Sequence, residues 1–344
     1  MSKKINKNFI IPIFIPNQGC PHRCIFCQQK TITNKSEALP TPQDIIATIE
    51  VAIKSKRCTK KKLKEVAFFG GTFTSLPNEV MKKMLGAVRP YIENGILHSI
   101  RISTRPDSLG EEKLNILDSF MVKTVELGIQ SMDDTVLMLS KRGHTSQDTV
   151  DAVKILKEKG FKVGAQLMPG LPGDSTGLFL STIEKVIGLK PDLARIYPTL
   201  VIRGTALEQW HNKGKYSPMG LDKTVNLCKK ACIRLEDAGI PIIRIGLMSS
   251  PSLLKKGEII AGPWHPSFGF LVRSAMYLER LRPYLPARGD AENITLRIHP
   301  SEVPLLIGHK RNGIKQIETM TEAVIKKIIS DDSISPGNVY VQTL

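Results

Sequence analysis

Three cysteines near the start of the chain have the spacing of a metal-binding loop. Cys20, Cys24 and Cys27 form a C-x3-C-x2-C pattern directly after an apolar stretch at residues 9–15 that is typical of a strand. A structural zinc site normally has four protein ligands, whereas a [4Fe-4S] cluster held by three thiolates keeps one iron open for a small molecule. Because no fourth cysteine lies nearby, the spacing favours the cluster, with zinc as the alternative.

The other cysteines do not complete this loop. Cys58 lies in a lysine-rich segment, and Cys228 and Cys232 are four residues apart on a predicted apolar helix, where buried packing is expected. Six cysteines in 344 residues, without a secretory signal, are too few for a disulfide scaffold. No apolar run approaches the roughly 18 residues of a membrane span, so we expect a cytoplasmic protein with reduced thiols.

Apolar runs of strand length alternate along the chain with helical patterns. The predicted strands cover residues 9–15, 66–69, 99–103, 122–127, 162–168 and 193–197. The predicted helices begin after Thr41 and cover residues 77–93, 146–159, 176–189 and 221–238. This order predicts an α/β fold with a parallel sheet, open or closed into a barrel, in which the loops at the carboxyl ends of the strands carry the chemistry.

Small and polar residues stand at several of these strand ends. Gly70, Gly71 and Thr72 follow the second strand, where two glycines allow close backbone approach to a ligand and offer N–H groups to a carboxylate. An ordinary turn is the alternative for these glycines.

The cysteine loop, with Phe26 just before its third cysteine, resembles the signature of the radical S-adenosylmethionine (SAM) superfamily. That resemblance implies a partial (β/α)6 barrel whose three cysteines ligate a [4Fe-4S] cluster, with SAM bound to the fourth iron. One electron, from a reductant such as flavodoxin or ferredoxin, then cleaves SAM to methionine and a 5′-deoxyadenosyl radical. The SAM-binding residues that it implies are Phe26, Gly70, Gly71, Thr72, Glu126, Gln130, Arg142 and Gln166, with Gln130 and Arg142 near the ribose and carboxylate.

Four further segments narrow the resemblance. Residues 102–107, 125–131, 168–173 and 196–205 are similar to the radical SAM domain of the elongator catalytic subunit, which modifies the wobble uridine of tRNA. The likeness covers roughly residues 8–250. In elongator an acetyltransferase domain follows, and the 90 or so residues left here are too few for one, so the involvement of acetyl-CoA stays open.

The pattern of elements changes after about residue 285. Several Pro and Gly residues there indicate a linker, which divides the chain into a barrel domain at residues 1–285 and a small α+β domain at residues 286–344. In the small domain a strand, a helix, a turn, a helix and a strand resemble the core of a KH RNA-binding domain. The resemblance implies that the turn, formed by Gly308, His309, Lys310 and Arg311, contacts an RNA backbone. An ordinary helix-turn-helix packing motif is the alternative.

The charge of the chain supports a polyanionic partner. Lys and Arg number 49 against 32 Asp and Glu, which leaves a formal charge of +17. A merely basic enzyme is the alternative. A lysine run at residues 60–64 either extends this basic surface or is only a solvated face.

A Gly- and Pro-rich loop at residues 262–269 contains His265. This histidine is a candidate substrate contact, with a structural turn as the alternative.

The leading hypothesis is a radical SAM enzyme that modifies a base of tRNA or rRNA, with no membrane association. Two alternatives remain open on the sequence. One keeps the radical chemistry but acts on a small molecule, as in the coproporphyrinogen-oxidase-like relatives. The other is a non-catalytic RNA-binding protein with a structural iron–sulfur cluster.

Overall fold

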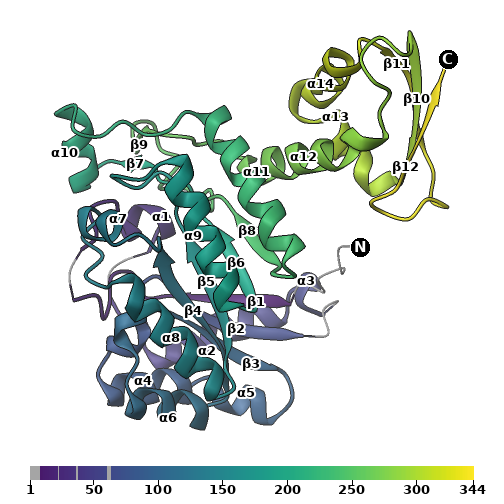
Figure 1. The fold of residues 1–344 in the computed structure, drawn as a ribbon. Helices are drawn as coiled ribbons and strands as arrows, with labels where there is room; N and C mark the ends of the chain where they lie inside the picture. The colour runs from purple at the N-terminus through teal and green to yellow at the C-terminus, as the bar shows by residue number, and fades with distance from the viewer. Residues whose placement is uncertain (1–7, 22, 36–37, 60–62) are drawn as a thin grey trace.

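The fold was analysed in a computed structural model of the chain, which describes residues 8–21, 23–35, 38–59 and 63–344. Most of the lysine run noted above, residues 60–62, lies outside these ranges. Figure 1 shows two parts, a large α/β body that contains the first 260 or so residues and a small domain at the C-terminus, joined by a long helix. No helix in the described ranges is long and apolar enough to cross a membrane.

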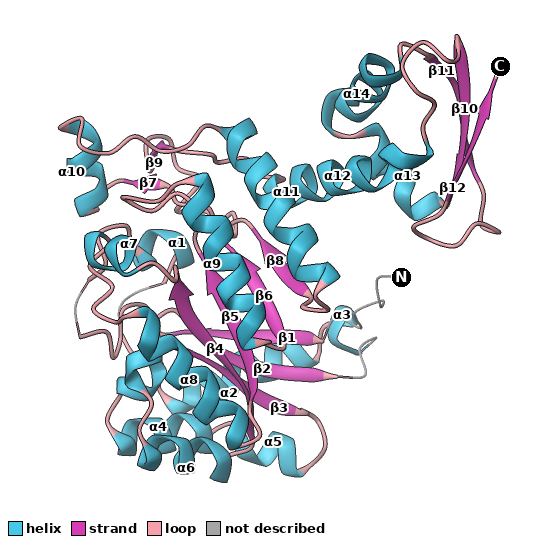
Figure 2. Cartoon of the chain, in the orientation of Figure 1, coloured by secondary structure: helices cyan, strands magenta, loops and turns pink. Residues whose placement is uncertain are grey.

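The large part is built on one parallel sheet. Within the described ranges its seven strands lie in the order β1-β2-β3-β4-β5-β6-β8, and the edge strands β1 and β8 do not pair, so the sheet is a partial barrel (Figure 2). The strands are β1 (Phe9–Phe14), β2 (Lys64–Phe69), β3 (Ser99–Thr104), β4 (Val122–Gln130), β5 (Lys162–Leu167), β6 (Leu193–Ile196) and β8 (Ile242–Ile245). The α/β fold class is therefore confirmed.

The number of strands differs from the six that the family resemblance implied. The additional strand is β8, which pairs in parallel with β6. It has four residues and includes Arg244, just as the equally short β6 includes Arg195, so length and charge alone do not distinguish it from a strand that was predicted. Its place at the sheet edge is set by the helix before it, which returns the chain to the start of the next strand.

Helices follow the strands and cover the outer face of the sheet (Figure 1). They are α2 (Pro42–Ile53), α4 (Asn78–Gly86), α5 (Arg89–Glu93), α6 (Glu111–Ser119), α8 (Ser146–Glu158), α9 (Thr176–Leu189) and α11 (Leu221–Asp237). Thr41 and Thr145 begin two of them with capping boxes. The single helix predicted at residues 77–93 is wrong, because the chain turns after Gly86 and a second short helix starts with Pro90 in its first turn.

The main core lies between the sheet and these helices. Its largest fully buried side chains include Phe68, Phe73 and Phe179, which come from the sheet, the loop after it and α9. Above the carboxyl ends of the strands lie α1 (Gln29–Thr33), α7 (Asp134–Leu139), α10 (Ala206–Asn212) and the paired short strands β7 (Val201–Ile202) and β9 (Ile259–Ala261). These segments surround the end of the barrel where chemistry was expected.

The small domain has the predicted order of elements. In the part of the chain that the structure describes, three strands form a sheet in the order β11-β10-β12, and this sheet packs against two helices. The elements are β10 (Asn293–Ile298), α13 (Val303–Ile307), α14 (Asn312–Thr321), β11 (Val324–Ser330) and β12 (Val339–Thr343). The preceding helix α12 (Phe268–Leu281) contributes Leu278 and Leu281 to the same core, so it packs with the small domain as well as with α11.

Candidate functional site

A cavity of about 750 Å³ occupies the inside of the partial barrel. Its volume lies within the usual range of pockets that hold a small ligand or cofactor. All three cysteines and all eight residues predicted to bind SAM line this cavity, although they are distributed over residues 20–166. They are Cys20, Cys24, Cys27, Phe26, Gly70, Gly71, Thr72, Glu126, Gln130, Arg142 and Gln166.

The cysteine loop is packed tightly against the loop that follows β2. Thr72 N donates a hydrogen bond to Gln18 O at 2.8 Å. A Cβ atom on Gly71 would overlap with Gln18 O, and a Cβ on Gly19, whose φ is 72°, would overlap with Thr72 O. The close approach at Gly71 is therefore between two segments of the chain, in addition to any ligand that lies beside it.

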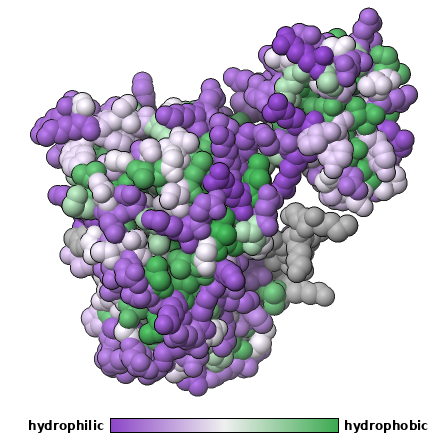
Figure 3. Space-filling model, in the orientation of Figure 1, coloured by the Kyte–Doolittle hydropathy of each residue, from purple (hydrophilic) through white to green (hydrophobic). Residues whose placement is uncertain are grey.

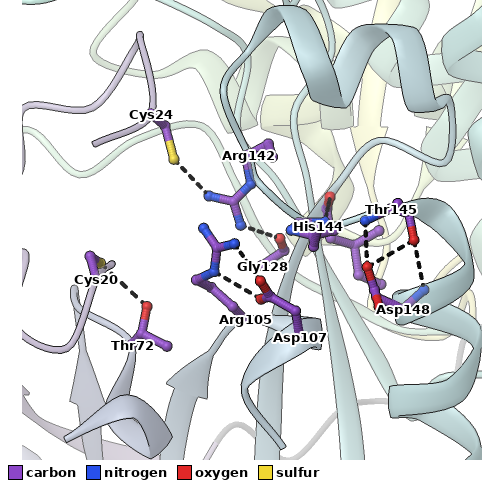
Figure 4. Close-up of polar contacts among 11 residues, drawn as sticks. Cys20, Cys24, Thr72, Arg105, Asp107, Gly128, Arg142, His144, Thr145 and Asp148 are labelled. Atoms are coloured by element: carbon purple, nitrogen blue, oxygen red, sulfur yellow. Dashed lines mark hydrogen bonds and ion pairs between the residues drawn. The ribbon is translucent and has the colours of Figure 1, made fainter. Parts of the chain in front are cut away.

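Each cysteine thiol has a polar neighbour. Cys20 Sγ lies 3.3 Å from Thr72 Oγ1, and Arg142 Nη1 donates to Cys24 Sγ at 3.0 Å (Figure 4). Cys27 Sγ donates to Asn17 Oδ1 over 3.7 Å. Burial raises the pKa of Cys20, and burial together with the neighbouring cysteines raises the pKa of Cys27 to about 12. Thiolates at these positions therefore need a positively charged partner such as iron.

The donor set is suited to a cluster. Among the described residues, no three His, Cys, Asp or Glu side chains are placed to hold one metal ion. A [4Fe-4S] cluster offers a separate iron to each thiolate, so its ligands need not converge on one point. Three thiols around the wall of one cavity, with the guanidinium of Arg142 beside them, fit such a group.

Arg142 and Gln130 meet at the end of β4. Arg142 Nη2 donates to Gly128 O at 2.6 Å, and a Cβ on Gly128 would lie 3.1 Å from the same nitrogen. The backbone of Gln130 has a φ of 67°, in the left-handed region that residues other than glycine rarely adopt. Its Oε1 is buried and has no hydrogen-bond partner among the described residues. An orphaned acceptor in the cavity wall fits a ligand that donates a hydrogen bond there.

Glu126 belongs to a belt of charges across the inside of the sheet. Its carboxylate pairs with Arg101 at 2.7 Å and with Arg195 at 2.7 Å, and Arg101 also pairs with Glu65 at 2.8 Å. Both oxygens of Glu126 are therefore engaged within the protein. Its assignment to SAM binding stays a prediction.

The other members of this charged belt were not predicted from the sequence. Each is a charged or polar residue within a predicted apolar strand or at its edge, which is the signal that could have revealed a polar barrel interior. Tyr197 extends the belt, because Arg195 Nη1 donates to its hydroxyl at 3.0 Å. The missed residues are Glu65, Arg101, Arg195 and Tyr197.

The turn residues predicted to bind RNA lie in the small domain, apart from this cavity. His309, Lys310 and Arg311 are exposed. The ring of His309 packs edge-on against that of His265, with 4.9 Å between their centroids, so the loop at residues 262–269 contacts the turn. A second groove, of about 830 Å³, lies between α11, α12 and α14 and includes both histidines in its wall.

Comparison with known proteins agrees with the geometry. Residues 14–186 match the model of the radical SAM superfamily, and residues 191–278 match that of the radical SAM C-terminal domain. An uncharacterized protein of Methanocaldococcus jannaschii is 33% identical over 64% of this chain and 70% of its own length. A tRNA uridine(34) acetyltransferase of Dehalococcoides mccartyi is 30% identical, over 58% of this chain and 50% of its own.

Among solved structures, archaeal Elp3 from Methanocaldococcus infernus superposes on this chain with a TM-score of 0.63 at 25% identity. The superposition covers 80% of this chain and 63% of the Elp3 chain. The chain spans about half the length of the curated tRNA uridine(34) acetyltransferases that it matches. The superfamily match covers the three cysteines, Glu65, Arg101 and Glu126 of the charged belt, and strands β2 to β5. On this match, and with three thiols lining one cavity inside the sheet, the chain belongs to the radical SAM superfamily.

Proposed function

We propose that this protein is a radical SAM enzyme that modifies a base of tRNA or rRNA. Membership of the superfamily implies a [4Fe-4S] cluster and SAM as cofactors. When bound, these two groups supply the radical that activates the substrate. The observation that carries the proposal is the convergence of Cys20, Cys24, Cys27, Arg142 and Gln130 on one cavity.

The side chains of the cavity have separable roles in this proposal. Cys20, Cys24 and Cys27 hold the cluster, and Arg142 balances the negative charge of the thiolates through its contact with Cys24. Gln130 orients SAM through its orphaned Oε1. The enclosing walls of the barrel limit the access of water and oxygen to the reacting atoms. A cytoplasmic location and a flavodoxin or ferredoxin as reductant complete the proposal.

Three observations support RNA as the substrate. The relatives that are 27% and 30% identical are tRNA uridine(34) acetyltransferases by name. The chain has a net charge of +17, which favours a polyanion. The small domain presents an exposed basic turn in which Lys310 and Arg311 have φ values of 49° and 61°.

The conformation of Arg311 bears on the likeness to a KH domain. In the G-x-x-G loop of that family a glycine takes this position, and the left-handed backbone of Arg311 is one that glycine adopts without strain. Gly308 and Gly313 serve packing, because a Cβ on either would crowd the neighbouring backbone. A glycine at this position would therefore fit the observed backbone, and Arg311 adds a cation there.

The groove beside the turn is also basic. Lys315 from α14 and Arg282 after α12 lie in its wall with Lys310, and Lys229 of α11 pairs there with Glu279 at 2.7 Å. Figure 3 shows hydrophilic side chains over α11 and α12, where the barrel and the small domain meet. We propose that the RNA backbone lies along this groove and the turn.

Replacement of Arg311 by glycine tests this proposal without backbone strain. Arg311→Gly should weaken the binding of total tRNA several-fold and reduce the salt dependence by about one phosphate contact. Lys190→Gly is the matched control, because Lys190 is also an exposed cation with a left-handed φ of 53°, at the end of α9 in the barrel. Binding is measured by titration at several salt concentrations.

The chemistry is tested in cells that lack the gene. Mass spectrometry of their tRNA and rRNA nucleosides should show one modification missing, and the parent protein should restore it while Arg311→Gly restores it poorly. An unchanged nucleoside profile, together with equal RNA binding by the two glycine variants, would favour the small-molecule alternative.

A further inference from the structure

Two arginines stand side by side inside the barrel on its last two strands. Arg195 of β6 and Arg244 of β8 are register partners in the parallel pair, and both line the cavity. Like charges on neighbouring strands repel each other unless a counter-charge lies close by. The charge around this pair therefore indicates what the cavity binds.

Arg195 is neutralised within the protein. Its guanidinium pairs with Glu126 at 2.7 Å and lies over the ring of Phe69, 4.8 Å from the centroid. The charged belt as a whole has no excess charge, since among described residues Glu65 and Glu126 balance Arg101 and Arg195. The belt therefore has no carboxylate left for a further cation.

Arg244 has no acidic partner within the described ranges. Arg244 takes part in no ion pair with another described residue. Within those ranges the Arg244 side chain donates a hydrogen bond from Nε to Gly246 O at 3.1 Å. This bond holds the guanidinium toward the carboxyl end of β8 while its two Nη groups can receive a ligand. Its neighbours in the cavity wall, Ile243, Leu247 and Met248, are apolar. A guanidinium beside apolar residues binds an oxyanion more strongly than one in open water does.

Arg244 is not among the residues expected to bind SAM. Those residues lie in the cysteine loop, in the loop after β2, on β4 and β5 and in the loop after α7, whereas Arg244 is on β8. The segment after β8 reaches the helix that follows the cysteine loop, since Ser250 Oγ donates to Thr31 O at 3.0 Å, so Arg244 shares one cavity with the cluster site. Arg244 therefore has no expected role in holding SAM, and it remains for the substrate.

We propose that Arg244 binds an oxyanion of the substrate inside the barrel. This inference rests on the proposed function, which places the radical chemistry in this cavity. If the substrate is RNA, the oxyanion is a phosphate of the target nucleotide. An arginine holds either a phosphate or a carboxylate through two parallel N–H···O bonds. A carboxylate would instead indicate a small acidic substrate, so the experiment includes both.

Chemical protection tests the oxyanion site directly. The reconstituted holoenzyme is treated without oxygen with phenylglyoxal, which reacts with accessible guanidinium groups, and the modified peptides are quantified by mass spectrometry. Uridine monophosphate should slow the modification of Arg244 at least threefold relative to sodium chloride of the same ionic strength. Arg234, an exposed arginine on α11 that pairs with Glu184, is the internal control and should not be protected.

The outcomes separate the sources of the oxyanion. Protection by uridine monophosphate and not by acetate supports a nucleotide phosphate. Protection by acetate alone supports an oxyanion site for a small acid and overturns the phosphate assignment. Modification of Arg244 at the same rate in all solutions overturns the proposal.

Substitution provides a second measurement. Arg244→Gln should raise the KM for the RNA substrate roughly tenfold or more with a smaller effect on kcat, because a charge-assisted pair of hydrogen bonds is lost. Arg244→Lys keeps the charge but not the paired geometry and should recover part of the loss. Arg234→Gln should match the parent, and thermal unfolding shows whether each variant is folded.

This pair of experiments keeps two failures distinct. If the parent protein modifies no RNA, the proposed function is wrong, while the phenylglyoxal result still decides whether Arg244 binds an oxyanion. If the parent modifies RNA and Arg244→Gln has an unchanged KM, the oxyanion site is wrong and the proposed function stands.

Discussion

The guanidinium of Arg142 joins two elements of the site that are far apart in sequence. Its Nη1 donates to Cys24 Sγ at 3.0 Å, across 118 residues of chain, and its Nη2 donates to Gly128 O at 2.6 Å. Gly128 leaves the space that the guanidinium occupies. The cysteine loop is thereby connected to the end of β4 by a single cation.

Replacement of Arg142 should therefore alter the cluster without removing its ligands. In Arg142→Gln the thiolates lose a neighbouring positive charge, so the reduced cluster is less stable and its potential should fall. The iron content should stay near the parent value while the rate of SAM cleavage under dithionite decreases. Potentials followed by electron paramagnetic resonance check this. An unchanged potential would mean that the contact is structural only.

The three cysteines of the loop should be necessary for iron, and the others should not. Cys20→Ala, Cys24→Ala and Cys27→Ala should each lose the [4Fe-4S] cluster, measured as iron and sulfide per chain after anaerobic reconstitution. Cys228→Ala is the matched control. Cys228 is fully buried in the main core, so this change should cost about 1 kcal/mol of stability and leave the iron in place.

Substitution of Gly71 should disturb the cysteine loop itself. A methyl group there would overlap with the backbone carbonyl of Gln18, so Gly71→Ala should lower both the iron content and the unfolding temperature. Gly188→Ala, in α9 with no atom within 4 Å of the added methyl group, should retain the iron and gain about 0.5–1 kcal/mol. Loss of SAM cleavage from Gly71→Ala with full iron content would instead assign the space beside Gly71 to the ligand.

His144 should make the stability of the protein depend on pH. Burial, and then the nearby Arg142 cation, lower its pKa from the ordinary 6.5 to about 4. Between these values the unfolded chain binds the proton and the folded protein does not, so stability falls as the pH is lowered through this window. From pH 6.5 to pH 5 the loss is about 2 kcal/mol.

The change that tests this is His144→Gln. Its amide can replace the hydrogen bond between His144 Nε2 and Ile129 O, which spans 3.2 Å. The difference in unfolding free energy between parent and variant should therefore shrink by about this amount as the pH falls from 6.5 to 5. His98→Gln, at an exposed position, is the control. A constant difference across the window would show that folding does not lower the pKa of His144.

The sequence by itself determined the features that depend on local patterns. The spacing of the three cysteines, the alternation of strands and helices, and the basic turn at residues 308–311 are all readable over short stretches, because side-chain period and turn chemistry are local properties. Six strands and the elements of the small domain were predicted in this way, and the structure confirms them. The residues predicted for SAM were also found along one cavity.

Only the tertiary structure decided which distant segments meet. The packing of Gly19 and Gly71 against each other's loops, the contact of Arg142 with Cys24, and the charged belt around Glu126 depend on strand order and register. The same holds for Arg244, whose strand was not predicted and whose lack of an acidic partner among the described residues is visible only beside Arg195. A one-residue shift in pairing moves every side chain of a strand to the other face of the sheet, and which strands pair in that register is decided by the packing of the whole fold.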